Sequence, residues 1–120
     1  MDNKENRKYV GKLILSVITG QCNAREAIKR FPVKTDASIE CAYHALVHYV
    51  ADEEMRYYDI EYRDAQDDYL EFLAQTLSAG NFLPKNIIQD YKPYYKGIAK
   101  PWKSNFKGFL DEFKRFININ

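Results

Sequence analysis

Apolar residues recur at helical spacing along most of this chain, and that periodicity restricts the possible folds more than any other feature. In residues 3–19 one helix face is marked by five apolar side chains: Val10, Leu13, Ile14, Val17 and Ile18. No stretch of useful length shows the alternation of apolar and polar residues that is typical of strands. The sequence therefore predicts an all-α fold, a compact bundle of five or six helices forming a single domain over residues 1–120.

Local end signals separate the first two helices. Gly20 ends the first, whose second face carries lysines at every fourth position. Asn23, with Glu26 three residues later, forms a capping-box pattern that predicts a short second helix. Pro32 stops that helix because proline cannot continue the backbone hydrogen bonding.

A long stretch without glycine or proline follows and is expected to hold two helices. Thr35 or Asp36 caps the third helix of the chain. Because an unbroken helix of about 40 residues would be unusual in so small a domain, we expect a turn or kink within residues 52–60. The fourth helix then ends at residues 78–81, where Gly80 favours a helix stop.

The C-terminal third is expected to contain a short helix, a loop and a final helix. Pro84 predicts the start of the short helix. Residues 92–103 contain Pro93, Gly97 and Pro101 and are expected to form a loop or a broken helix. A helical apolar pattern then returns at Phe106, Phe109, Leu110, Phe113, Phe116 and Ile117.

Charge is distributed in three blocks that the formal net charge of +1 conceals. Residues 1–35 carry 8 basic and 3 acidic side chains, residues 36–80 carry 2 and 11, and residues 81–120 carry 8 and 3. Such blocks bear on partners rather than on fold. Among the acidic residues, Asp64 with Asp68 and Asp67 with Glu71 are like-charge i, i+4 pairs, which destabilise an isolated helix.

The acidic block favours a non-catalytic function. We expect an interaction module whose acidic surface, over about residues 52–71, docks on a protein partner with a basic surface or supports self-association. The expected contact residues are Asp59, Asp64, Asp67, Asp68 and Glu71. A solvated helix face neutralised by the chain's own basic ends is the competing interpretation of the same residues.

Residues 91–107 support an alternative hypothesis, a protein that binds single-stranded nucleic acid. Lysines neutralise phosphates and aromatic rings stack on unpaired bases, so both residue types suit that ligand. The candidate contacts are Lys92, Tyr95, Lys96, Lys100, Trp102 and Lys103. The segment lacks arginine and the chain is not basic overall, so this hypothesis ranks second.

A third hypothesis is a metal-binding protein or metal-dependent enzyme built on His44 and His48, an i, i+4 pair. Both fall about 140–180° from the apolar stripe of their helix, so we expect them at the surface or against a second layer of helices. The chain has no second cluster of ligands and no E-x-x-H motif. We therefore expect no metal site and no cofactor.

Other classes have little support in the sequence. The glycines are scattered singly, so there is no phosphate-binding loop, and no catalytic signature is present. Cys22 and Cys41 are too few and too far apart for a disulfide scaffold, which favours reduced thiols. No apolar run is long enough to span a membrane, and no secretion signal stands out. We expect a cytoplasmic protein.

Overall fold

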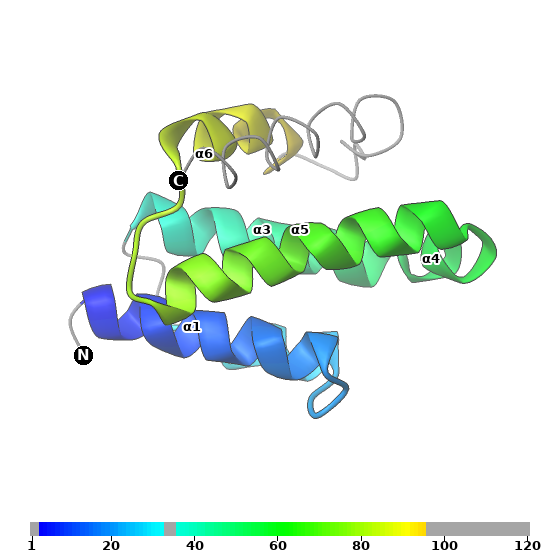
Figure 1. Cartoon of the computed structure of the whole chain (residues 1–120), viewed down its shortest axis with the longest axis horizontal. Coiled ribbons are helices and arrows are strands. Elements are labelled where there is room, and N and C mark those ends of the chain that lie inside the picture. The colour runs from blue at the N-terminus through cyan, green and yellow to red at the C-terminus, as the bar shows by residue number, and fades with distance from the viewer. Residues whose placement is uncertain (1–2, 33–35, 96–120) are drawn as a thin grey trace.

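The computed structural model describes residues 3–32 and 36–95 (Figure 1). Within these ranges the helices are α1 (Asn3–Ile18), α2 (Ala24–Lys29), α3 (Ala37–Ala51), α4 (Glu53–Tyr58), α5 (Ile60–Ser78) and α6 (Lys85–Tyr91), followed by the 3-10 helix η1 (Lys92–Tyr95). The described residues contain no strand, and the all-α prediction is confirmed. The final helix expected around residues 106–117 lies outside the described residues.

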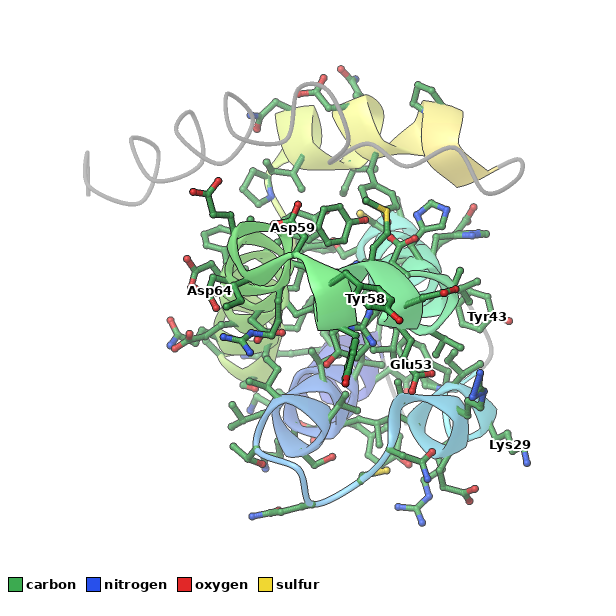
Figure 2. The ribbon with its side chains drawn as sticks, turned by 90° about the vertical axis from the view of Figure 1, so that its right-hand side faces the viewer. Lys29, Tyr43, Glu53, Tyr58, Asp59 and Asp64 are labelled. Carbon is green, nitrogen blue, oxygen red and sulfur yellow. The ribbon has the colours of Figure 1, made fainter. Side chains whose placement is uncertain are left out.

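The helices are arranged in layers, with α3, α4 and α5 between α1 and α2 on one side and α6 on the other (Figures 1 and 2). The most extensive contact is between α1 and α5. These two helices run antiparallel, because Gly80 after α5 lies beside Lys4 near the start of α1, whereas Gly11 lies against Ala74. α3 contacts α1, α2, α5 and α6, and so links the layers.

The helices α2 and α3 begin at the side-chain caps that the sequence predicts. The carboxamide of Asn23 accepts a hydrogen bond from the Glu26 amide at 2.8 Å, and Asp36 caps α3 through the Ile39 amide at 2.8 Å. Each cap satisfies a backbone N–H that the first helical turn leaves without a partner. Asn23 and Asp36 are therefore confirmed as helix starts.

The stretch from α3 to α5 breaks twice, which confirms the turn expected within residues 52–60. The first break is at Asp52, between α3 and α4. The second is at Asp59, where the backbone becomes extended and the side chain caps α5 through the Tyr62 amide at 3.1 Å. The short helix α4 therefore forms the connection between the two longer helices α3 and α5, with a break in the helical backbone at each of its ends.

Glycines with positive φ end α1 and α5. Gly20 has φ +80°, and Gln21 beyond it donates to the Ser16 carbonyl at 2.8 Å. Gly80 has φ +83°, and Asn81 donates to the Thr76 carbonyl at 3.2 Å. Only glycine adopts this backbone conformation without steric cost, so both helix ends follow from the local sequence.

The core lies mainly between α1, α3 and α5. Its fully buried side chains come from the predicted stripes and from α5 positions beside them, among them Ile14, Ile39, Leu46, Tyr69, Leu70, Leu73 and Leu77. Several polar residues are buried with them: Asn6, Arg7, Ser38, His48, Asp52 and Gln66. Buried polar groups need hydrogen-bond partners, so the burial of these six side chains depends on their polar contacts as well as on packing.

Candidate interaction surface

The acidic residues of α5 are distributed over its outer face. Asp64, Asp68 and Glu71 are exposed, as is Asp59 at the helix start, while Asp67 is only partly exposed. Figure 2 shows Asp64 pointing away from the bundle. The structure thus places four of the five predicted contact residues at the surface.

The exposed acids make short-range contacts along this face. Arg63 pairs with its neighbour Asp64 at 3.2 Å, and both side chains are at least half exposed. Gln75 donates to Glu71 at 3.2 Å. Contacts of this kind in water contribute little stability, and they leave the carboxylates accessible to a partner.

Asp52, expected at the N-terminal limit of the acidic surface, is only 1% exposed, and that part of the prediction is wrong. Its Oδ2 atom accepts a hydrogen bond from the Tyr62 hydroxyl at 2.6 Å and lies 3.5 Å from the amide nitrogen of Gln66. Both partners come from α5, so Asp52 ties the α3–α4 break to the helix beside it. Glu53, the next acidic residue along the chain, is exposed.

Arg56 extends this polar cluster toward the surface. Its guanidinium donates to the Gln66 side chain at 3.1 Å and to the Tyr49 carbonyl, and it stacks 3.5 Å above the Tyr49 ring. Burial, assisted by the bond to Asp52, raises the pKa of the Tyr62 hydroxyl well above its ordinary range. The hydroxyl therefore remains a proton donor to Asp52 at neutral pH, which suits a structural contact.

Asp67 lies between the exposed acidic face and Arg56. Burial raises the pKa of its carboxyl, Asp64 and Asp68 act in the same direction, and Arg56 and Arg63 oppose them. A carboxyl whose pKa is raised by folding favours the folded state most when it is protonated. At neutral pH the ionised form of Asp67 therefore weakens the fold.

We accordingly expect Asp67→Asn to raise the free energy of unfolding at pH 7 by roughly 0.5 kcal/mol, a modest gain because the group is partly solvated. The gain should shrink as pH falls, and it should vanish below the ordinary aspartate pKa of about 3.9, where wild-type Asp67 is protonated too. Urea denaturation from pH 3 to pH 7 measures this difference. Asp68→Asn, at an exposed neighbour, is the control, and a destabilised Asp67→Asn protein at pH 7 would contradict the assignment.

An exposed apolar corner borders the acidic face. Tyr57, Tyr58 and Ile60 are 80%, 77% and 63% exposed, and α4 has no buried residue. The two tyrosine rings meet edge to face, with centroids 5.0 Å apart. Exposed acids, among them Glu54 and Asp59, lie in the same part of the chain. Large rings exposed together are typical of contact surfaces rather than of a solvated helix.

The sequence does contain a signal for this corner. Tyr57 and Tyr58 are adjacent, and neighbouring residues of a helix point about 100° apart, so both rings cannot be fully buried on one narrow stripe. Tyr57 and Tyr58 were not among the predicted contact residues, which were all acidic.

The two histidines occupy different environments. His48 is buried, and its Nδ1 atom is hydrogen-bonded to the Tyr91 hydroxyl of α6 at 2.5 Å. His44 is partly exposed and lies edge-on to Tyr43. Across residues 3–32 and 36–95, no three His, Cys, Asp or Glu side chains come together in a metal-binding group. For His48, packing against a second layer is what the structure shows.

Most of the lysine-rich segment proposed for nucleic acid lies outside the described residues, including Lys96, Lys100, Trp102 and Lys103. Lys92 is exposed at the start of η1. Tyr91, which opens the segment, is buried, and its ring stacks on that of Tyr69 with centroids 5.8 Å apart. Tyr91 therefore belongs to the core, and the nucleic-acid hypothesis for the remaining residues stays a prediction.

Two further properties of the described chain are clear. Cys41 is buried and Cys22 is partly exposed, and they form no disulfide with one another. Among the described helices, none combines the length and apolar character that crossing a membrane requires.

Comparison of the chain with protein-family models, with curated proteins and with solved structures found no match in any of the three.

Proposed function

We propose that this protein is a non-catalytic interaction module that binds a basic protein surface through the acidic face of α5 and the neighbouring corner of α4. The observation that carries the proposal is the position of three exposed apolar side chains, Tyr57, Tyr58 and Ile60, beside exposed carboxylates. Aromatic rings supply buried contact area in protein interfaces, and surrounding charges select and orient the partner.

The electrostatics of α5 support the same proposal. Asp64 and Asp68 lie one helical turn apart on an exposed face, and such like-charge spacing works against the helix itself. A basic partner would relieve this repulsion. Affinity is therefore expected to fall as salt screens the charges, because these carboxylates are solvated in the unbound protein.

The proposal can be tested with a synthetic amphipathic Lys/Leu helix, labelled for fluorescence anisotropy, and with a Glu/Leu helix as the negative probe. The triple variant Asp64→Lys/Asp68→Lys/Glu71→Lys is expected to bind the Lys/Leu helix at least about tenfold more weakly than wild type, since three favourable charge contacts become repulsive. Tyr58→Ser should also weaken binding, because it removes apolar contact area.

The matched control reverses three exposed acids elsewhere, Glu5→Lys, Glu26→Lys and Asp90→Lys, and so changes the net charge equally. It is expected to retain most of the affinity. Equal losses in the two triple variants would mean that net charge alone governs binding, and the proposal would then fail.

A further inference from the structure

One end of the bundle carries opposite charges on two halves of the same surface. Figure 2 looks onto this end face and shows Asp59 and Asp64 on one side, Lys29 diagonally opposite, and Tyr58 between them. The acidic half extends from α4 to the start of α5 and carries four exposed acids, Glu54, Asp59, Glu61 and Asp64, against one exposed cation, Arg63, which pairs with Asp64. The basic half is formed by α2 with its C-cap and carries three exposed basic residues, Arg25, Lys29 and Arg30, against one exposed acid, Glu26, which lies 4.0 Å from Arg30.

The two halves meet at the centre of the face. Arg25 of α2 and Glu53 of α4 approach to 3.9 Å across this boundary, and both side chains are largely exposed. Hollows of about 650 and 470 Å³ open here, and they share Arg25, Val50 and Glu53 in their walls. The smaller hollow is also lined by Tyr57 and Tyr58. The middle of the end face is therefore recessed, and the exposed rings of Tyr57 and Tyr58 lie there beside the hollows.

A surface with one acidic and one basic half is complementary to itself. A second copy can be placed by a 180° rotation about an axis that lies in the plane of this face, along the boundary between the two halves. The acidic half of each copy then lies over the basic half of the other. The same rotation brings the central tyrosines of the two copies together over the hollows, where their rings would leave water. An unrelated basic partner would match the acidic half alone.

We infer that the end face is a homodimer interface, and that its occupant is a second copy of this chain bound about a two-fold axis. The inference rests on the proposed function, because it takes the acidic surface to recognise a basic protein surface and identifies that surface as α2 of an identical chain. Arg25 and Lys29 of one copy face Glu54 and Asp64 of the other, with Tyr57 and Tyr58 at the centre.

A charge-swap experiment tests this arrangement. One variant, Arg25→Glu/Lys29→Glu, makes the end face predominantly acidic, and another, Glu54→Lys/Asp64→Lys, makes it predominantly basic. Sedimentation velocity at low salt is expected to show a wild-type dimer that dissociates as salt is added. Each variant alone should dimerise at least about tenfold more weakly, because like charges oppose one another at both contacts. An equimolar mixture of the two should recover a dimer.

The central contact has its own test. Tyr58→Ser should also weaken the dimer at least about tenfold, by removing aromatic area from the middle of the interface. Tyr9→Ser, at an exposed tyrosine of α1 away from this face, is the matched control and should leave dimerisation unchanged. Circular dichroism confirms that each variant remains folded.

Two results would overturn the inference. A wild-type protein that remains monomeric at low salt up to sub-millimolar concentration has no such interface. A wild-type dimer together with monomeric mixed variants would place the contact on another surface. The proposed function is tested separately by the Arg25→Glu/Lys29→Glu variant, which retains the acidic face of α5. This variant should still bind the Lys/Leu helix although it no longer dimerises, and loss of that binding would contradict the proposed function rather than the dimer.

Discussion

Replacing Gly11 by alanine is expected to lower the free energy of unfolding by about 3 kcal/mol, the upper part of the range for inserting a methyl group into a close-packed interface. Gly11 lies where α1 crosses α5. A Cβ atom there would meet the Ser78 backbone nitrogen and would lie 2.6 Å from the Ser78 hydroxyl and 2.7 Å from the Ala74 carbonyl oxygen. Since two of these atoms belong to the α5 backbone, the helices themselves would have to separate.

The expected sign is opposite to that of helix propensity. In an exposed helix interior, replacing glycine by alanine stabilises the helix by about 1 kcal/mol. At Gly11 the loss of packing along α1 and α5, the most extensive helix pair, should outweigh that gain. Urea denaturation at neutral pH measures the net change.

Gly20→Ala provides the comparison for Gly11→Ala. Gly20 has positive φ but nothing within 4 Å of an added Cβ, so alanine there is opposed by backbone conformation alone. We expect a loss of about 1 kcal/mol, roughly the cost of a left-handed conformation for a residue with a Cβ. If Gly11→Ala were as stable as wild type, α1 and α5 could not approach as closely as the structure places them.

Features that depend on local chemistry could be predicted from the sequence. Asn23 and Asp36 cap helices by bonding to amides three residues away, and that relation is present in the chain itself. Gly20 and Gly80 end helices for an equally local reason, the positive φ of the residue after the last turn. The apolar periodicity likewise located the core faces of α1 and α3.

Asp52 and Asp59 show where such prediction ends. Both are aspartates at helix breaks, and the chain gives no local reason to treat them differently. Asp59 caps α5 at the surface, whereas Asp52 turns inward because Tyr62 and Gln66 of another helix supply its hydrogen-bond donors. The burial of a charged side chain depends on what lies opposite it in space, which periodicity within one helix cannot report.

The same distinction applies to the candidate site. The acidic residues of α5 were predicted to form a contact surface because residues 36–80 carry an excess of acidic side chains and because Asp64 with Asp68 and Asp67 with Glu71 are like-charge i, i+4 pairs. The opposition of α2 and α4 on the end face was not predicted, since Arg25 and Glu53 are 28 positions apart and meet only through the packing of α2 against α3. The distribution of charge along a sequence therefore predicts a binding surface poorly, because the fold decides which charged side chains share a face.

Arg7→Ala is expected to cost about 3 kcal/mol, comparable to the effect at Gly11, because it removes one partner of a buried ion pair. Arg7 Nη1 lies 3.0 Å from the Asp36 carboxylate, and both side chains are at most 12% exposed. Its Nε donates to the Gly80 carbonyl at 3.0 Å, and its guanidinium stacks 3.9 Å from the Phe82 ring centroid. One side chain thus joins the start of α1 to the start of α3 and the end of α5.

The geometry also separates arginine from lysine at this position. A lysine ammonium retains the charge for Asp36, but it cannot reproduce two donors held apart in a plane or the stacking on Phe82. We expect Arg7→Lys to lose about 1–2 kcal/mol, intermediate between wild type and Arg7→Ala. Lys12→Ala, at an exposed position of the same helix, should change stability by no more than about 0.5 kcal/mol.

A double-mutant cycle with Asp36→Asn isolates the ion pair from the cap. Asp36 Oδ1 accepts the Ile39 amide while Oδ2 faces Arg7, and asparagine can retain the cap while losing the charge. In wild type, Asp36→Asn leaves a buried guanidinium without its carboxylate. In an Arg7→Ala background the same change instead removes an uncompensated carboxylate. The two substitutions should therefore be non-additive by at least about 1 kcal/mol. Additive losses, measured by urea denaturation, would mean that Arg7 acts through Gly80 and Phe82 alone.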